Sequence, residues 1–239
     1  MIAVPRARGR CPTDSREEPG CYTGALAGMQ VVRYTFTERA IHALGALAFL
    51  YVLITGLAFW TPSLYWMATV LGGGFLARLL HPWVGIVFCA LMLWMARVWR
   101  ADMRVTSADR RWRRAMTKYI RNEDASVPAA GRFNYGQKVF FWAMAWGTLA
   151  LFVSGLVLWR PDLVPADAAI VRQLAILVHA IGALVTIAAF IVHVYMGVFV
   201  VPGSVDAILH GEVSDEWARH HHRLWADEVA ARRAGRADR

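Results

Sequence analysis

Four histidines lie inside long apolar stretches of the sequence, where an ionisable side chain is rare and usually functional. Two of them, His179 and His193, stand fourteen residues apart in the run ILVHAIGALVTIAAFIVHVYMGV, which contains no charged residue. Fourteen helical residues turn through about 1400°, so both side chains would lie on one face, about 21 Å apart along the axis. The other two, His42 and His81, each stand near the start of another apolar run.

Neutral imidazole is a common metal ligand, and a flat cofactor with two open axial positions would explain histidines at two depths. Zinc or proton-relay sites would tend to include carboxylates, but no Asp or Glu lies inside the apolar runs. We therefore predict two haem b groups; the absence of a CxxCH motif excludes the covalent c type. The alternative is that the histidines are hydrogen-bonded packing residues. Four glycines near them would either admit the macrocycle or serve close helix packing: Gly45, Gly85, Gly182 and Gly197.

The elements that must position these histidines are four apolar runs, at about 40–61, 79–99, 138–159 and 174–200. Each is close to the ~20 residues that an α-helix needs to cross about 30 Å of hydrocarbon, and none alternates as a barrel strand would. The chain is 57% hydrophobic, which is too apolar for an ordinary soluble domain. We predict an all-α fold, an integral membrane four-helix bundle.

The bundle is expected to occupy residues 33–202. Residues 1–32 are predicted to be a flexible N-terminal extension, in which Met29 is a candidate start, and residues 203–239 a cytoplasmic C-terminal tail.

The net charge of +9 does not indicate nucleic-acid binding, because the basic residues alternate between the two sides of the predicted membrane bundle. Lys and Arg number 6 before the first run, 1 before the second, 9 between the second and third, 2 before the fourth and 6 after it. By the positive-inside rule, both termini and the long middle loop are cytoplasmic. His42 and His193 then form an inner pair, and His81 and His179 an outer pair. Tryptophans near the helix ends are expected to form an interfacial belt: Trp60, Trp66, Trp83, Trp99 and Trp159.

Several motifs together resemble a known family over about residues 30–215. They are YTFTERAIH before the first run, HPW at the start of the second, GRFNYGQKVFFW at the start of the third, and the two histidines fourteen apart. This combination is similar to the cytochrome b, or γ, subunit of membrane-bound formate dehydrogenases. Cytochrome b subunits of nickel-iron hydrogenases and thiosulfate reductases, and small di-haem b561 cytochromes, form the competing set. A haemless membrane anchor or transport protein is the alternative of another class.

The resemblance implies a subunit of an oxidoreductase complex in the bacterial inner membrane that does not itself oxidise formate. Electrons from a molybdenum or tungsten α subunit would pass through an iron-sulfur β subunit to the outer haem, the inner haem and then a quinone, either ubiquinone or menaquinone. The chain has three cysteines and no cluster motif for an iron-sulfur centre, so it would supply only the last part of this relay.

The resemblance also implies a quinone site at FNYGQKVFF, residues 133–141. Asn134 and Gly136 would lie beside the quinone headgroup, next to the inner ligand His193. The Asn134 side chain, the Gln137 side chain or the Gly136 backbone N–H could donate to a quinone carbonyl. The alternative is a loop-to-helix junction with Asn134 as N-cap.

Three polar features lie outside the apolar runs. The segment RRWRRAMTKYIRNE, 110–123, indicates a basic interfacial helix attracted to anionic lipid, or else a solvated loop. The run His220, His221 and His222 is predicted to be solvated and to hold no metal. Trp217 and Trp225 suggest that the C-terminal tail docks on the membrane or on a partner.

Overall fold

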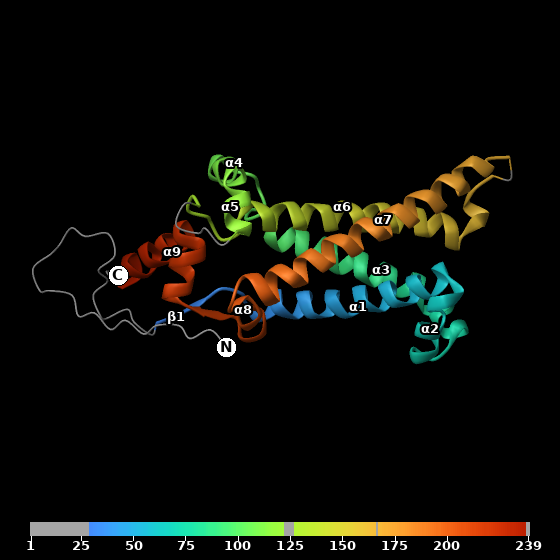
Figure 1. The fold of residues 1–239 in the computed structure, drawn as a ribbon, viewed down its shortest axis with the longest axis horizontal. Helices are drawn as coiled ribbons and strands as arrows, with labels where there is room; N and C mark the ends of the chain where they lie inside the picture. The colour runs from blue at the N-terminus through green and yellow to red at the C-terminus, as the bar shows by residue number, and fades with distance from the viewer. Residues whose placement is uncertain (1–28, 122–126, 166, 238–239) are drawn as a thin grey trace, which may run out of the picture.

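The computed structural model describes residues 29–121, 127–165 and 167–237. Four long helices lie together in a bundle (Figure 1): α1 (Phe36–Trp60), α3 (Gly74–Trp99), α6 (Tyr135–Trp159) and α7 (Ala169–Tyr195). All four are long and apolar enough to cross a membrane, and α7 continues as a π-helical turn, Met196–Val200. The predicted all-α membrane bundle is confirmed, and the prediction for residues 1–28 lies outside the described residues.

Each long helix begins three to five residues before the apolar run that predicted it. Thr35 accepts from the Glu38 backbone N–H while Glu38 accepts from that of Thr35, which forms a capping box at the start of α1. Asn134 and Gln137 do the same for α6. Hydropathy alone misses these starts because a first helical turn is often polar.

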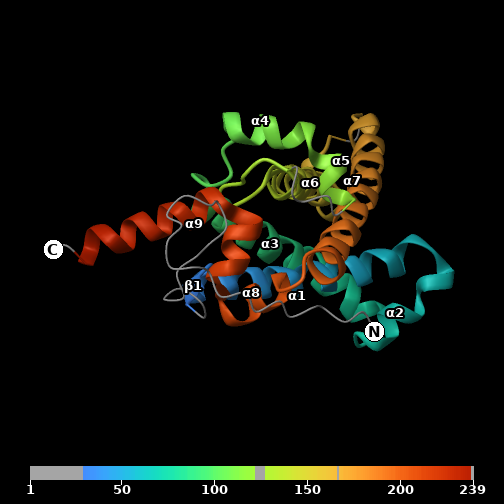
Figure 2. The same cartoon turned by 60° about the vertical axis from the view of Figure 1, so that its left-hand side comes forward.

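The helices follow each other up and down the bundle. Helix α1 packs along α3, α6 packs along α7, and α3 lies against α6. Helix α7 crosses the bundle obliquely, so that it lies beside α6 at one end and approaches α1 at the other (Figures 1 and 2). Aromatic contact between Phe49 and Phe190, with ring centres 5.0 Å apart, joins α1 to α7 near mid-bundle.

The connections at the two ends of the bundle differ in size. At one end, short turns containing Pro62–Leu64, α2 (Trp66–Val70) and Pro161–Leu163 join the helices in pairs. At the other end lie the first described residues, the C-terminal region and the middle loop with α4 (Ser107–Arg114) and α5 (Met116–Ile120). The described parts of the three basic regions therefore share one end, as the charge distribution predicts. Their cytoplasmic location stays a prediction.

The chain's two terminal regions form one folded unit, the terminal cap, which comprises residues 29–35 and 203–237. Strand β1 (Gln30–Val32) pairs antiparallel with β2 (Glu212–Ser214), between α8 (Ser204–His210) and α9 (Asp215–Ala237). An apolar cluster holds the unit together: Val31, Ala207, Val213, Ala218, Trp225 and Ala226. Residues 30–32 thus form a strand where a flexible extension was predicted. The tail docks on its own chain, with Trp225 in this cluster. The sequence does not reveal the β1–β2 pairing, because a three-residue strand is too short for its periodicity to indicate a partner.

A buried polar network lies under the terminal cap. Arg33, only 2% exposed, donates to the Arg132 carbonyl and to His222 Nε2, at 2.7 and 3.0 Å. His222 Nδ1 donates to the Gly131 carbonyl at 2.8 Å. The prediction that the three histidines are solvated is therefore wrong for His222, which is 2% exposed. A break in α9 at this residue turns its side chain to the interior.

One tryptophan also departs from the predicted interfacial belt. Trp99 is buried, and its indole N–H donates to Glu38 Oε1 at 2.6 Å. Glu38 in turn accepts from Arg132 at 2.8 Å. The Glu38 carboxylate therefore keeps the Trp99 side chain in the interior of the bundle, whereas Trp60 and Trp83 are exposed.

Candidate functional site

The bundle brings the four intramembrane histidines together in two pairs at two levels. His42 of α1 faces His193 of α7, with ring centres 6.2 Å apart, towards the end that carries the terminal cap. His81 of α3 faces His179 of α7, with ring centres 6.5 Å apart, towards the opposite end. These are the partners that residue depth and charge predict.

The spacing within each pair fits two axial ligands on one metal. Metal–imidazole bonds of about 2 Å, with about 1.2 Å from each nitrogen to its ring centre, put two axial ring centres roughly 6 to 6.5 Å apart. Direct ring packing is closer: Phe140 stacks on His193 at 4.3 Å with planes 6° apart. No group of three or more His, Cys, Asp or Glu among the described residues could hold a metal ion, so a zinc-type site finds no support there.

Each outer histidine has a hydroxyl partner on the neighbouring helix. Thr55 Oγ1 lies 2.7 Å from His81 Nδ1, and Ser154 Oγ lies 3.1 Å from His179 Nδ1. Both hydroxyls already donate their hydrogen to a carbonyl one turn back in their own helix, at 2.8 and 2.7 Å. With the hydroxyl hydrogens on these carbonyls, the hydroxyl oxygens accept from Nδ1–H; this tautomer leaves Nε2 of each ring with the lone pair that a metal ligand needs.

A glycine follows each of these hydroxyl residues and lies against the imidazole. A Cβ at Gly56 would lie 3.6 Å from His81 Cε1, and one at Gly155 would lie 3.1 Å from His179 Cε1. Sequence reasoning missed both pairs. Their signal was present as the dipeptides Thr-Gly and Ser-Gly, at 55–56 and 154–155, inside apolar runs.

The four glycines singled out from the sequence divide into two kinds. A Cβ at Gly182 would lie 3.4 Å from Leu151, and one at Gly45 would lie 3.9 Å from Met95, so these two serve helix packing. A Cβ at Gly85 or Gly197 would meet no described atom within 4 Å. The space beside Gly85 and Gly197 is therefore not filled by described atoms.

The inner pair has aromatic surroundings. Phe140 of α6 covers one face of His193, and the described residues provide no side-chain hydrogen bond to either inner imidazole. Between the two histidine levels, the side chains of Phe49, Phe88 and Phe190 fill the bundle. Phe49 contacts the other two, with ring centres 5.5 and 5.0 Å away.

The residues predicted for the quinone site form the start of α6. Asn134 Oδ1 accepts from the Gln137 backbone N–H, and Gln137 Oε1 accepts from that of Asn134, both at 2.9 Å. The N-cap alternative therefore describes the local structure correctly. The amide N–H₂ of Asn134 takes no part in this cap. A Cβ at Gly136 would lie 3.8 Å from the ring of Trp112, so α4 covers this glycine.

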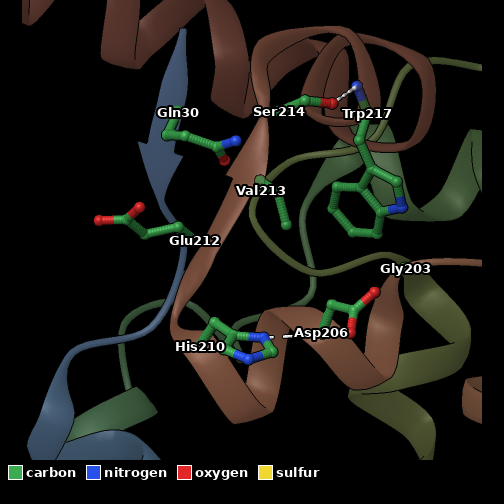
Figure 3. A pocket seen from close by; sticks show the side chains of 8 residues that line it. All are labelled: Gln30, Gly203, Asp206, His210, Glu212, Val213, Ser214 and Trp217. Carbon is green, nitrogen blue, oxygen red and sulfur yellow. Dashed lines mark hydrogen bonds and ion pairs between the residues drawn. The ribbon is translucent and has the colours of Figure 1, made fainter. Parts of the chain in front are cut away.

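A surface pocket of about 450 Å³ opens elsewhere, in the terminal cap (Figure 3). The β1–β2 ribbon, α8 and the start of α9 line it, with His210, Asp206 and Trp217 among its side chains. None of the paired histidines and none of residues 134–137 belongs to it. It is therefore separate from the candidate site.

Comparisons with known proteins agree with the motifs. The family model for prokaryotic cytochrome b561 matches residues 33–211. The formate dehydrogenase cytochrome b556(fdo) subunit of Escherichia coli K12 is 36% identical over 200 residues, which are 83% of this chain and 93% of that protein. The nitrate-inducible cytochrome b556(Fdn) subunit of the same organism is 32% identical, over 83% of this chain and 91% of its own length.

A formate dehydrogenase cytochrome b556 subunit from Haemophilus influenzae is 29% identical over 199 residues, 83% of each chain. The predicted resemblance to formate dehydrogenase cytochrome b subunits is thereby confirmed. The chain belongs to the prokaryotic cytochrome b561 family.

Proposed function

We propose that this chain is the cytochrome b subunit of a membrane-bound formate dehydrogenase and passes electrons to a membrane quinone. The observation that carries the proposal is the spacing of the two histidine pairs, 6.2 and 6.5 Å between ring centres, inside a membrane bundle. Family membership and relatives named as formate dehydrogenase cytochrome b subunits support it.

In this proposal, His42 and His193 hold the inner haem b, and His81 and His179 hold the outer one. Haem, when bound, supplies a one-electron carrier at each level. The helices keep the imidazoles facing each other. The layer of Phe49, Phe88 and Phe190 excludes water between the levels and keeps the surroundings apolar.

We place the terminal cap and both termini in the cytoplasm of a bacterium, with the bundle in its inner membrane. The basic residues at that end support this orientation. The opposite end would receive electrons from an iron-sulfur subunit, which a molybdenum or tungsten subunit supplies. An electron that moves inward works against an inside-negative potential, at about 2.3 kcal/mol per 100 mV for a full crossing, so the transfer would help to generate that potential.

We place the quinone at the inner level, beside Asn134, Gly136, Gln137 and His193. Phe140 supports this position, because it lies less than two turns beyond Asn134 along α6 and stacks on His193. The Asn134 amide is the donor that the helix cap leaves available for a quinone carbonyl.

The test is the haem content of the chain purified from membranes, alone or within its complex. Reduced-minus-oxidised spectra and pyridine haemochrome assay should give two b haems in the wild type. His81→Ala should lose the outer haem and His193→Ala the inner one, while His210→Ala, which changes an exposed histidine of the terminal cap, should keep both. A wild-type chain without haem would contradict the proposal.

The source of the electrons is tested separately, since hydrogenase and thiosulfate reductase complexes are the alternatives to a formate dehydrogenase. Formate, but not hydrogen, should reduce both haems in native membranes. Reduction by hydrogen alone would assign the chain to a hydrogenase.

A further inference from the structure

We propose that Thr55 and Ser154 lower the reduction potential of the outer site by accepting hydrogen bonds from its two histidines. This inference rests on the proposed haem ligation and goes beyond it. It concerns positioning residues, which act through His81 and His179 rather than on the metal itself.

Only one direction of these hydrogen bonds is compatible with metal ligation through Nε2. Thr55 Oγ1 donates to the Tyr51 carbonyl at 2.8 Å, and Ser154 Oγ donates to the Ala150 carbonyl at 2.7 Å. A neutral imidazole that binds a metal through Nε2 carries its hydrogen on Nδ1, so in the proposed ligation Nδ1–H donates to the hydroxyl oxygen, over 2.7 and 3.1 Å. An Nδ1–H that donates to an oxygen fixes the tautomer and makes the ligand nitrogen more basic.

Both hydroxyls are built into the bundle. Thr55 is 0% exposed and Ser154 is 4% exposed, so water does not compete for these bonds. Gly56 and Gly155 follow them and lie against the rings: a Cβ at Gly155 would be 3.1 Å from His179, a tight contact, and one at Gly56 would be 3.6 Å from His81, an ordinary contact. The same hydroxyl-glycine pair thus occurs in two helix hairpins, since α1 presents it to α3 and α6 presents it to α7.

The inner histidines, His42 and His193, lack hydroxyl acceptors of this kind among the described residues. His193 has the stacked ring of Phe140, and among the described side chains none accepts a hydrogen bond from either inner imidazole. More basic ligands favour the oxidised, ferric state. The outer site should therefore have the lower potential, and transfer of one electron from the outer level to the inner level is favourable.

The experiment is a potentiometric titration of the purified haem-loaded chain or complex, with the outer haem assigned as the one missing from His81→Ala. The variants are Thr55→Val, Ser154→Ala and their combination. Thr186→Val is the matched control, because its buried hydroxyl bonds only carbonyls of its own helix. Thr55→Ser keeps the acceptor.

Loss of either acceptor should raise the midpoint potential of the outer haem, and a tenfold change in the ferric-to-ferrous preference corresponds to about 59 mV. The inner haem, Thr186→Val and Thr55→Ser should keep wild-type potentials. Selective loss of the outer haem from Thr55→Val, restored in Thr55→Ser, would also support the inference. An unchanged outer potential in both single variants, or an equal shift of both haems, would overturn it. A wild-type chain without haem would instead overturn the proposed function.

Discussion

Asn134 has two separable chemical roles at the start of α6. Its Oδ1 caps the helix through the Gln137 N–H, whereas its amide N–H₂ takes no part in the cap. A substitution that keeps the acceptor and removes the donor therefore distinguishes quinone binding from helix capping.

Asn134→Asp should slow quinone reduction about fivefold, because one hydrogen bond contributes roughly 1 kcal/mol, without lowering thermal stability. Asn134→Ser also caps and carries no charge; its shorter side chain cannot place a donor where the amide N–H₂ lies, so it should also slow the reaction. Asn134→Leu should slow the reaction and also cost about 1 kcal/mol of stability through the lost cap. The measurement is steady-state reduction of a soluble quinone, with haem spectra as the control. Wild-type kinetics in Asn134→Asp and Asn134→Ser would leave Asn134 as a cap only.

At the scale of elements, a buried ion pair attaches α4 to α6. Lys138 Nζ lies 2.8 Å from Asp109 Oδ2, and both side chains are 6% exposed. Burial alone would raise the pKa of Asp109, but hydrogen bonds from Lys138 and Thr106 hold it below its usual value. Helix α4 consequently runs across the first turns of α6, with its four arginines exposed (Figure 2). The basic segment is thus helical at residues 107–120, apart from Ala115.

Asp109→Asn should release α4 from α6, because it leaves the Lys138 ammonium buried without a counter-charge, at a cost of about 3 kcal/mol. Asparagine still accepts from the Thr106 N–H, so the helix cap is kept. The measurement is amide hydrogen exchange, which should lose protection in α4 and keep it in α7.

The control is Asp162→Asn, which breaks the exposed pair with Arg160 and should change nothing measurable. Asp109→Leu combined with Lys138→Met should recover much of the protection. Unchanged exchange in Asp109→Asn would show that the ion pair does not hold α4 in place.

At the scale of the whole molecule, the chain's two ends are joined over the middle loop. His222 of α9 contacts Arg33 from the N-terminal region and Gly131 from the loop that leads into α6. Burial, together with the charge of Arg33, holds the pKa of His222 well below its usual value. The interior around it also contains Trp217, and His221 is its neighbour in sequence. The terminal cap is therefore assembled with His222 neutral.

The terminal cap should lose stability as the pH falls below about 6.5. A histidine in the unfolded chain binds a proton near that pH, whereas folded His222 does not. Each further pH unit of acidification therefore lowers the free energy of unfolding by up to about 1.4 kcal/mol. Above about pH 7, His222 is neutral in both the folded and the unfolded chain, so it does not make stability depend on pH. Exchange protection of the Arg33 N–H, which donates to the Gly211 carbonyl, should fall about tenfold between pH 6 and 5 after correction for intrinsic rates.

His222→Asn should lower the exchange protection of the Arg33 N–H at all pH values. It should also remove most of the dependence of that protection on pH, since asparagine does not titrate. His210→Asn, at a 73% exposed side chain of the same unit, should keep the wild-type dependence. Equal protection of the wild type at both pH values would contradict the prediction.

The amino-acid sequence by itself determined the bundle, the levels of the four histidines and their partners. Apolar length fixes which segments can span a bilayer, charge fixes which helix ends share a side, and helical geometry fixes depth along each span. These quantities depend on one helix at a time. His42 could therefore be matched with His193, and His81 with His179, before any packing was known.

Only the tertiary structure decided which side chains meet between helices. The approach of Thr55 to His81, the burial of Trp99 against Glu38 and the inward turn of His222 depend on how helices and loops rotate and dock. The pairing of β1 with β2 joins segments about 180 residues apart, which no local pattern records. Such contacts follow from the packing of the whole chain, because the free energy gained by burial depends on how all the segments pack together and not on the conformational preference of each segment alone.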